Sequence, residues 1–521
     1  MKRREFMSKS GKAVALTTVA AGLGGMRIDA LAASPVMNRM NQLAGDNDRV
    51  FVLVQLTGGN DGLNTIIPID NADYYKARPT IAIQKKDTLA LRNGLGWHPA
   101  LSGFKSMYDK GTLSVVQGVT YPNPDRSHFR GTDIWLTATD TDVFKDTGWV
   151  GRYLQTLAPN FPTTMPEHPL AVQIGTSLTL GFKAPGGSIG ITFRDPDAFY
   201  SLVEQNGNSA YDAAPKTYGG DELDFMRSVE RSSQLYSKAV KAAADKVKQN
   251  KVTYPTGLGQ SLRIVARLIA GGLKTKFYLV NIQGNSFDTH IDQGGATGAH
   301  ASLLQQVSDG VKAFMDDCDQ LGIGDRVAGM TFSEFGRRVM ENGSRGTDHG
   351  TAAPLFVFGK NVIGNQVHGA DPNLTSLDNR GDLLMDFDYR QVYAAALMQW
   401  FGAAQTDLQQ ALLRDFAPLP LFNQLSSAGD EESAQLLASM RTYPNPSSDV
   451  AVISYSLPSA ADVRVTMHDI RGSVIGVPFS GQQQEGAQTV SANVATLPAG
   501  TYFFTINAGR LKQMKAFTVM R

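Results

Sequence analysis

The sequence predicts a large α/β domain with a mostly parallel sheet and helices on both faces, followed by a small all-β module. In the larger part, short apolar runs alternate with longer amphipathic segments, which is the pattern of strands and covering helices. Polar, glycine-rich loops follow several of these runs, as is typical of a sheet with a ligand site at one edge. The end of the chain contains only short alternating runs separated by Gly, Pro and Ser, which predicts antiparallel strands.

The composition is that of a globular protein and excludes one class of function. Apolar residues make up 42% of the 521 residues and charged residues 19%, and the formal net charge is +1. A chain with so little net charge has no electrostatic footprint for nucleic acid, so we expect no nucleic-acid partner. Cys318 is the only cysteine, which excludes an intramolecular disulfide, and its place on an apolar helical stripe predicts a buried thiol.

Residues 1–33 look like a twin-arginine export signal. Arg3 and Arg4 precede a mild apolar stretch over 13–25, and the small residues of a cleavage site follow at 30–32. The apolar stretch is shorter than the roughly 20 residues that span a bilayer, so we expect no permanent membrane span. The resemblance implies the twin-arginine export machinery as a partner and transport across the inner membrane to the periplasm. The alternative is a disordered basic tail.

Six apolar runs in the larger part have the length and composition of buried strands. They are Val50–Leu56, Leu113–Val119, Leu170–Ile174, Phe277–Ile282, Arg326–Phe332 and Leu355–Phe358. Four segments have the apolar spacing of helices, namely Pro99–Lys110, Leu223–Val247, Leu262–Gly271 and His300–Leu321. We therefore predict one α/β domain over residues 45–423.

Polar side chains follow four of these runs, at the points where the predicted strands end. In open α/β sheets, ligands bind beyond the carboxyl ends of the strands, so we expect these side chains to lie close together. Carboxylates and imidazoles from separate segments are the ligands that divalent metal ions require. The candidate residues are Asp61, Arg126, Ser127, His128, Asp288, His290, Asp348 and His349.

Several of these residues have a purely structural alternative. Asp61 stands in a glycine-rich turn and is also placed to form an Asx-turn. Ser127 is also placed to be the N-cap of a helix that continues through Trp135. Asp348 and His349 also fit a helix cap or hydrogen bonds to the loop backbone. The recurrence of such loops after successive strands favours the shared site.

The C-terminal residues 442–521 resemble the type IX secretion sorting domain, an immunoglobulin-like sandwich. The resemblance is carried by Tyr443-Pro444-Asn445-Pro446, by Leu497-Pro498-Ala499-Gly500 and by the terminal run 515–519. It implies the type IX secretion machinery as a partner and final delivery to the cell surface or the extracellular space. The alternative is an accessory immunoglobulin-like domain with a binding role. A Ser-rich acidic segment over 424–441 is a predicted linker.

The motifs of the larger domain, taken together, resemble an exported family called domain of unknown function 1501. That family is similar to the alkaline-phosphatase/sulfatase superfamily, so the expected fold is alkaline-phosphatase-like. The motifs are Gly58-Gly59-Asn60-Asp61, Ser127-His128-Phe129, Asp288-Thr289-His290, Ser333-Glu334-Phe335 and Asp348-His349-Gly350.

The resemblance implies two metal sites and a serine nucleophile. Asp61, Asp348 and His349 would hold one divalent ion, with Ser127 as the nucleophile and His128 and Arg126 as catalytic neighbours. Asp288, His290 and His368 would hold a second ion. Asp292 or His300 is an alternative second-site ligand, because Asp288 and His290 stand closer together than the superfamily usually places them. The ions would be zinc, calcium or manganese, and the anion would be gripped by Arg126, Arg130 or Arg337.

These observations predict an exported metal-dependent hydrolase that acts on a small anionic ester of phosphate or sulfate. The alternative, from a different class, is a non-catalytic cell-surface or carbohydrate-binding protein on the same fold. A flavin or nicotinamide enzyme is disfavoured, because no Gly-x-Gly-x-x-Gly fingerprint follows the first predicted strand.

Overall fold

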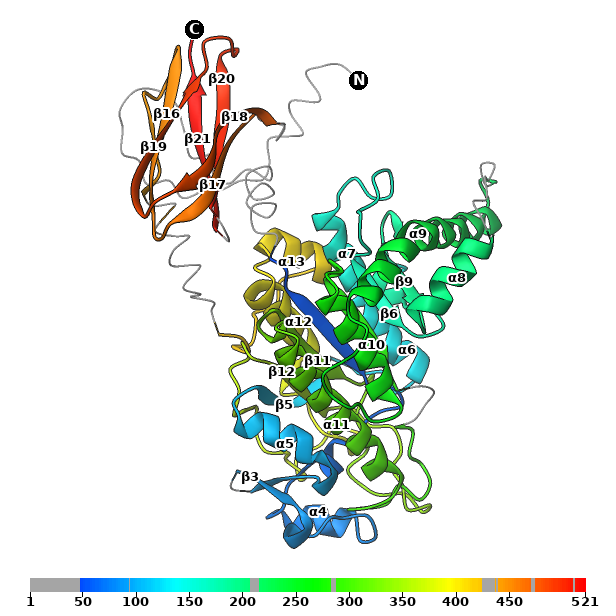
Figure 1. Ribbon diagram of the computed structural model, residues 1–521. Helices are drawn as coiled ribbons and strands as arrows, with labels where there is room; N and C mark the ends of the chain where they lie inside the picture. Colours follow the sequence, from blue (N-terminus) through cyan, green and yellow to red (C-terminus); the bar gives the residue numbers. More distant parts are fainter. Residues whose placement is uncertain are drawn as a thin grey trace, which may run out of the picture.

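The computed structural model describes residues 47–92, 94–206, 215–282, 287–423, 436, 439–469, 474–508 and 511–521. The predicted signal of residues 1–33 lies outside these residues, as does most of the predicted linker. In the described part, one large mixed sheet with helices is followed by two small antiparallel sheets, which are the orange and red strands of Figure 1. The fold class expected from the sequence is therefore confirmed.

The large sheet has nine strands, and the candidate site lies beyond the carboxyl ends of its central strands. Its order is β13-β5-β12-β11-β1-β10-β6-β9, with β14 paired to β5 beside this path. The strands are β1 Val50–Gln55, β5 Leu113–Thr120, β6 Ala171–Ile174, β9 Gly190–Phe193, β10 Phe277–Asn281, β11 Val327–Phe332, β12 Ala353–Gly359, β13 Gln366–His368 and β14 Phe387–Asp388. The six predicted strands are all among them, with ends shifted by at most two residues.

The helices cover both faces of this sheet. They are α4 Ala72–Ala77, α5 Ser102–Asp109, α6 His128–Thr137, α7 Trp149–Leu157, α8 Pro196–Asn206, α9 Tyr218–Lys246, α10 Leu258–Ala270, α11 Ala299–Gln320, α12 Tyr389–Ala395 and α13 Gln405–Leu412. The four predicted helices correspond to α5, α9, α10 and α11. The domain also contains two small sheets. One consists of β2 Ile66–Ile67, β4 Leu95–Trp97 and β3 Leu89–Arg92, and the other of β7 Lys183–Ala184 and β8 Gly187–Ser188.

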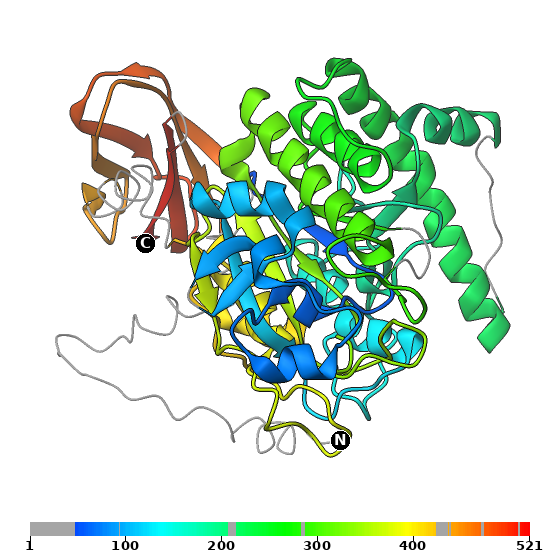
Figure 2. The same ribbon diagram turned by 90° about the horizontal axis from the view of Figure 1, so that it is seen from below.

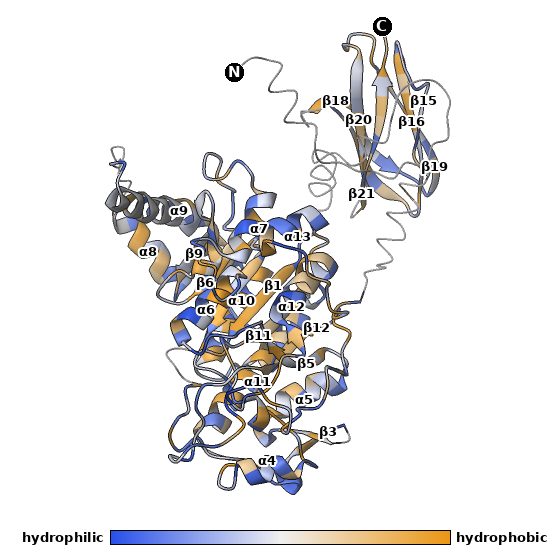
Figure 3. Ribbon diagram, turned by 180° about the vertical axis from the view of Figure 1, so that it is seen from behind, coloured by the Kyte–Doolittle hydropathy of each residue, from blue (hydrophilic) through white to orange (hydrophobic). Residues whose placement is uncertain are grey.

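The central strand β1 shows why two helical layers form. Its side chains alternate between the two faces of the sheet, and all of them are buried. Val50, Val52 and Val54 join the core under α5, α9, α10 and α11, whereas Phe51 and Leu53 join the core under α6, α7, α12 and α13. Figure 2 shows the green helices α9 to α11 together on one side of the domain, and Figure 3 shows strand β1 in orange.

One strand of the large sheet runs against its neighbours, and this reversal matters for the site. β1 is parallel to β10 and β11, but β12 is antiparallel to both β11 and β5. The start of β12 therefore lies at the same edge as the carboxyl ends of β1, β10 and β11. The loop that precedes Ala353 is brought to the edge where the other polar loops emerge.

The C-terminal sheets form a sandwich with its own core. One sheet has the order β15-β16-β19 and the other β18-β17-β20-β21. The strands are β15 Arg441–Tyr443, β16 Val450–Leu457, β17 Ala461–His468, β18 Val474–Gln483, β19 Gly486–Asn493, β20 Gly500–Ala508 and β21 Leu511–Val519. Residues of both sheets, including Ile453, Val465 and Phe504, share one apolar cluster.

Candidate metal centre

Glycine at the end of β1 allows the polar loops to approach one another. Gly58 has a φ of +113°, and a Cβ at this position would lie 2.5 Å from the backbone nitrogen of Asp288. Only glycine accommodates both the left-handed conformation and this contact without strain. Because of this close approach, the loop after β1 packs directly on the segment that carries Asp288 and His290.

Three imidazoles gather around the carboxylate of Asp288. Its Oδ1 lies 3.0 Å from Nε2 of His290 and 3.2 Å from Nε2 of His349, and its Oδ2 lies 3.4 Å from Nε2 of His128. The Nε2 atoms of His290 and His349 are 3.0 Å apart. Ligand atoms around a tetrahedral zinc ion are about 3.3 Å apart, because zinc–nitrogen distances are roughly 2.0–2.1 Å. The spacings around Asp288 are of this size, and the ligand atoms of His128, Asp288 and His349 all lie within 4.8 Å of one another.

Each of the three rings has its other nitrogen, Nδ1, opposite an oxygen acceptor. Nδ1 of His128 lies 2.8 Å from Oε1 of Glu334, and Nδ1 of His290 lies 3.0 Å from Oδ1 of Asp348. Nδ1 of His349 lies 2.8 Å from the carbonyl oxygen of Arg126. Ionised carboxylates and carbonyl oxygens only accept hydrogen bonds, so a proton on Nδ1 satisfies each of these acceptors, and it is the tautomer that a cation between the Nε2 atoms and Asp288 would select.

This tautomer leaves lone pairs on all three Nε2 atoms. Two lone pairs 3.0 Å apart, on His290 and His349, repel each other unless a cation or a proton lies between them. Nε2 of His128 is buried and has no hydrogen-bond partner among the described residues. Metal-binding histidines characteristically donate their other N–H to a carboxylate or carbonyl, which is the arrangement here. The donor set therefore fits a divalent ion.

Arg337 holds the loops of the site in place. Its side chain is fully buried and donates hydrogen bonds to the carbonyl oxygens of Gly59 and Thr347, each at 2.8 Å, and of Phe287 at 3.0 Å. It also donates to Oδ1 of Asp288 at 2.6 Å. One guanidinium thus connects the loops after β1 and β10 with the loop before β12. Its donors are used within the protein, so it is not placed to grip a substrate anion.

The ionisation of the cluster follows from these contacts. Partial burial opposes ionisation of Asp288, but the hydrogen bond and charge of Arg337 lower its pKa below the usual value. Burial lowers the pKa of His349, which favours the neutral ring. The hydrogen bond from His128 to Glu334 raises the pKa of that imidazole, so its Nε2 is a more basic ligand.

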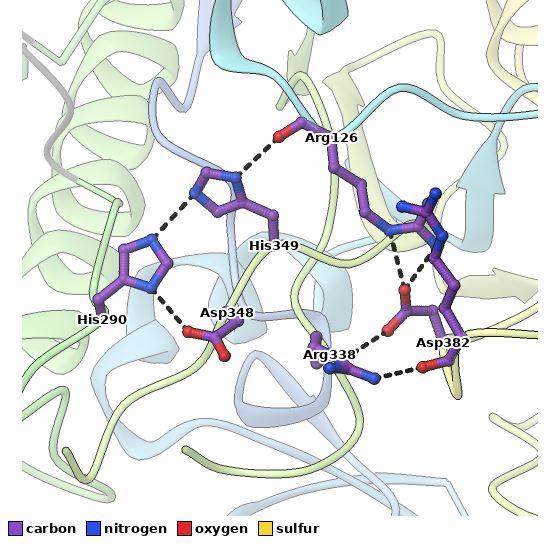
Figure 4. A pocket seen from close by; sticks show the side chains of 7 residues that line it. Arg126, His290, Arg338, Asp348, His349 and Asp382 are labelled. Carbon is purple, nitrogen blue, oxygen red and sulfur yellow. Dashed lines mark hydrogen bonds and ion pairs between the residues drawn. The ribbon is translucent and has the colours of Figure 1, made fainter. Parts of the chain in front are cut away.

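A cavity of about 560 Å³ opens beside the cluster. His290, His349 and Asp348 lie on one side of it, and Arg126, Arg338 and Asp382 lie on the other, as Figure 4 shows. Arg380 completes the lining. The cavity thus combines candidate metal ligands with three arginines, which is a suitable environment for an anionic group.

The arginines differ in how they are engaged. Arg126 bonds to Asp378 at 2.8 Å and to Asp382 at 2.6 Å. Arg338 lies 3.4 Å from the same Asp382. The guanidinium of Arg380 has no carboxylate partner among the described residues, and the residue is exposed; its backbone N–H donates to Asp378. Outside the cavity lining, Arg130 donates to the carbonyl oxygens of the loop over 140–143.

Asp61, a predicted ligand, is bound by residues outside the cluster. Its side chain is fully buried, and its Oδ2 accepts hydrogen bonds from Arg78 at 2.6 Å and from Gln293 at 2.5 Å. Burial raises its pKa, but the charge and hydrogen bond of Arg78, together with the contributions of His300 and Gln293, hold it below the usual value. Gln293 accepts a hydrogen bond from Thr347, the residue before Asp348. Asp61 thus supports the loop of Asp348 through two intermediaries.

The remaining predicted residues are placed differently. Ser127 is exposed at the N-cap position of α6, and its side chain forms no capping hydrogen bond. His368 is half-buried on β13, paired in register with Val116, and its Nε2 has no partner among the described residues. Asp292 forms a surface ion pair with Arg345. His300 is buried, with its Nε2 3.0 Å from Oδ1 of Asn60.

Four residues of the site had no predicted role, namely Glu334, Arg338, Arg380 and Asp382. Glu334 is fully buried, and its Oε1 also accepts a hydrogen bond from the backbone nitrogen of Gly58. A glutamate directly after a buried apolar strand was the available signal, because a carboxylate in that position needs a partner. Arg380 gave no signal, since it lies in a polar loop far from every predicted strand.

Comparison with known families identifies two regions of the chain. A family model described as a protein of unknown function, DUF1501, matches residues 202–412. A model described as a secretion system C-terminal sorting domain matches residues 441–520. Residues 202–412 are thus similar to the DUF1501 model, and residues 441–520 to the sorting-domain model. No curated protein matches the sequence.

The solved structures that resemble this chain do so only distantly. A protein of the alkaline phosphatase superfamily from Vibrio parahaemolyticus shares 10% identity over 79% of this chain and 76% of its own, with a TM-score of 0.33. The PsFucS1 sulfatase from Pseudoalteromonas sp. shares 12% over 88% and 87%, with a TM-score of 0.31. PorZ, a type IX secretion component of Porphyromonas gingivalis, shares 20% over 19% of this chain and 14% of its own, with a TM-score of 0.14. Similarities this low do not transfer an activity, which has to be argued from the site itself.

Among the described residues, no helix combines the length and apolar character needed to cross a bilayer.

Proposed function

We propose that the protein is an exported metal-dependent hydrolase of phosphate or sulfate esters, with a divalent ion held by His128, Asp288, His290 and His349. The observation that carries the proposal is the shared orientation of three imidazoles. Each uses Nδ1 on an oxygen acceptor and turns Nε2 toward the carboxylate of Asp288. A structural role for these rings does not require three Nε2 atoms around one carboxylate.

The donor set favours zinc over calcium. Calcium takes six to eight oxygen ligands, whereas imidazole nitrogen suits zinc and neighbouring transition metals. Three nitrogens and one carboxylate oxygen are therefore a poor calcium site. Asp348 acts on the ion through His290, because its carboxylate accepts the hydrogen bond from Nδ1 of that ring. Glu334 does the same for His128, and the carbonyl of Arg126 does so for His349.

The cavity beside the ion binds the anionic group of the ester. Arg380 supplies the guanidinium for this role, because Arg126 and Arg338 already contact Asp382. A bidentate contact from a guanidinium matches the geometry of a phosphate or sulfate. The divalent ion, when bound, supplies a Lewis acid that offsets the charge of the ester oxygens and lowers the pKa of a nearby hydroxyl.

Ser127 is the proposed nucleophile. It directly precedes His128 and stands at the start of α6, where backbone N–H groups and the helix dipole favour an anion. Its Oγ would form a bond to phosphorus or sulfur while the bond to the alcohol oxygen breaks, and the alcohol leaves with a proton. Water would then cleave the serine ester, releasing phosphate or sulfate and restoring the hydroxyl.

Export of this enzyme relies on its two ends. Residues 1–33 would direct it through the twin-arginine machinery to the periplasm. The sorting domain over 442–521, joined to residues 45–423 by the proposed linker 424–441, would pass it to the type IX machinery and so to the cell surface or beyond.

The test is metal analysis of the purified mature protein together with turnover of 4-nitrophenyl phosphate and 4-nitrophenyl sulfate. We expect bound zinc and release of nitrophenol from one of the two esters. His349→Ala should lose both metal and turnover. His368→Ala should keep both, because His368 pairs with β5 on the edge strand β13. Ser127→Ala should keep the metal and lose turnover.

Two results would contradict the proposal. A metal-free protein that turns over neither ester would favour the non-catalytic surface protein. Metal bound equally well by wild type and His349→Ala would place the ion elsewhere.

A further inference from the structure

Residues 377–383 form a tight hairpin that supplies two residues of the cavity lining, Arg380 and Asp382. The backbone nitrogen of Asp378 donates to the carbonyl oxygen of Asp382 at 2.9 Å, and that of Gly381 donates to the carbonyl oxygen of Asp378 at 3.1 Å. Oδ1 of Asp378 accepts the backbone N–H groups of Arg380 and Asp382 at 2.8 and 2.9 Å. These local bonds make the hairpin one unit, so its attachment to the protein decides where the loop of Arg380 lies.

Asp382 attaches this hairpin to the rest of the cavity wall. Its side chain is 1% exposed, and its Oδ2 accepts hydrogen bonds from Nε and Nη2 of Arg126 at 2.9 and 2.6 Å. Its Oδ1 lies 3.4 Å from Nε of Arg338. A carboxylate this deeply buried requires such cationic partners. Figure 4 shows the carboxylate of Asp382 between the two guanidinium groups.

Arg126 connects this attachment point to a proposed metal ligand. Its carbonyl oxygen lies 2.8 Å from Nδ1 of His349 and orients that ring. Residues 121–127 belong to no helix or strand, so neither helix nor sheet hydrogen bonds hold this carbonyl in place. The guanidinium of Arg126 supplies side-chain contacts instead, to Asp382 at 2.6 Å and to Asp378 at 2.8 Å.

We propose that Asp382 is a positioning residue of the metal centre, which acts on His349 through Arg126. The inference rests on the metal centre of the proposed function. The carboxylate of Asp382 contacts arginines and not the proposed ligands, so Asp382 is not a catalytic residue. Arg380, the proposed anion-binding residue, belongs to the same hairpin. One carboxylate therefore sets both the orientation of a metal ligand and the place of the loop that binds the anion.

The experiment is a double-mutant cycle on zinc affinity, with the dissociation constant measured by competition with a chromogenic chelator. Asp382→Asn removes the charge of the carboxylate, and Arg126→Gln removes the guanidinium while keeping the carbonyl oxygen. We expect each variant to weaken zinc binding by about three- to tenfold, less than the roughly 10- to 100-fold effect of losing a direct partner of a metal-bound histidine. Because both changes break the same connection, the double variant should bind zinc no more weakly than the weaker single variant.

A second measurement separates metal binding from anion binding. Calorimetry gives the affinity of the zinc-loaded protein for inorganic phosphate and inorganic sulfate. Arg380→Ala should weaken the binding of at least one of these anions and leave zinc affinity unchanged. Asp382→Asn should weaken the binding of both zinc and the anion, because it loosens the whole hairpin.

The matched control is Asp388→Asn, which breaks another largely buried ion pair between an aspartate and an arginine. Asp388 is 12% exposed, and its Oδ2 lies 2.6 Å from Nη2 of Arg390. Neither residue lines the cavity. This variant should lose stability but keep the wild-type zinc affinity. Equal losses of zinc affinity in Asp388→Asn and Asp382→Asn would trace the effect to general destabilisation and overturn the inference.

Two further results would overturn the positioning role. One is wild-type zinc affinity in Asp382→Asn, and the other is a double variant in which the two losses add up. If Asp382→Asn does not fold, Arg126→Gln decides alone, and unchanged zinc affinity in that variant refutes the role.

These outcomes are separate from failure of the proposed function. If the protein hydrolyses a nitrophenyl ester and binds zinc independently of Asp382, only the positioning role fails. If zinc affinity depends on Asp382 and Arg126 while neither ester is hydrolysed, the positioning role stands and the hydrolase proposal fails. A wild type that binds no zinc overturns both.

Discussion

Nδ1 of His128 lies 2.8 Å from the carboxylate of Glu334, a fully buried residue that follows the central strand β11. The same carboxylate oxygen accepts the backbone N–H of Gly58 at 2.8 Å. Glu334 therefore fixes the orientation of one candidate ligand and the position of the loop after β1 at once. It is a positioning residue, because it contacts the ligand and not the ion.

Glu334→Gln should weaken metal binding about 10- to 100-fold, the usual effect of losing a partner of a metal-bound histidine. The amide keeps the shape of the side chain but loses the negative charge that raises the basicity of His128. Competition with a chromogenic zinc chelator gives the dissociation constant. Glu341→Gln is the control, since Glu341 accepts hydrogen bonds from Thr80 and Ile81 instead. Equal zinc affinity in wild type and Glu334→Gln would rule out the positioning role.

Asp61→Asn should destabilise the fold while leaving the zinc content unchanged. The substitution leaves the guanidinium of Arg78 buried beside a neutral amide, and breaking a buried ion pair in this way costs about 3–5 kcal/mol. Urea unfolding measures the loss, and elemental analysis measures the zinc. A stable variant that has lost its zinc would instead make Asp61 a ligand.

Gly58→Ala should destabilise the fold and weaken zinc binding together. The left-handed backbone strains any other residue by about 1–3 kcal/mol, and the added Cβ would collide with the backbone of Asp288. Gly219→Ala is the matched control, because a Cβ there meets nothing within 4 Å and alanine is favoured in a helix. Thermal unfolding with and without zinc compares the two variants. Unchanged zinc binding in Gly58→Ala would show that the site does not need the close contact between the loop after β1 and the backbone of Asp288.

Zinc removal should lower the stability of the α/β domain. A ligand at 100 times its dissociation constant stabilises the folded state by about 2.7 kcal/mol. Thermal unfolding in excess zinc and after exhaustive chelation measures the shift. In His349→Ala the two curves should coincide, whereas a shift of wild-type size in that variant would contradict the assigned ligands.

His300 should make the metal-free protein less stable as the pH falls. Burial lowers the pKa of His300 to about 3, whereas an unfolded histidine titrates near 6.5. Between these values the unfolded chain binds a proton that the folded chain does not, so stability is lost as the pH drops through this window. A single such group contributes at most about 1.4 kcal/mol per pH unit.

The measurement is urea unfolding of chelated protein at several pH values between about 7 and 4, with His300→Gln for comparison. Other histidines contribute to the slope in both proteins, so the difference between the two slopes isolates His300. The variant should show the shallower decline. Parallel slopes would mean that His300 takes up its proton at the same pH in the folded and the unfolded chain.

Much of the fold could be predicted from the sequence, because strand and helix signals were strong where burial was complete. Every residue of β1 and β11 is buried, so an unbroken apolar run was visible in each. β9 was missed, since Gly190 begins a run of only four residues. The reversed direction of β12 was also not predictable, because it depends on which strands become neighbours and not on the local sequence.

The candidate site could be predicted only in part. The loops that carry Asp288, His290 and His349 were recognisable as polar segments at strand ends. Their convergence, and the addition of His128 to the same group, depend on three-dimensional packing. Asp61 had the right residue type in the right loop, but Arg78, only 17 residues later, binds its carboxylate. The pattern of polar residues at strand ends gives no indication that a residue so close in the chain binds the carboxylate.

The order of the large sheet has a consequence for where this protein can be cut. Strands that precede residue 202, namely β1, β5, β6 and β9, are interleaved with later strands in the sheet, so the segment matched by the DUF1501 model is not a separable folding unit. A truncated version that begins at residue 202 would lack the middle strand β1 and leave β10 and β11 with no neighbour between them. Each half of this domain completes the other, and neither should be soluble when expressed without it.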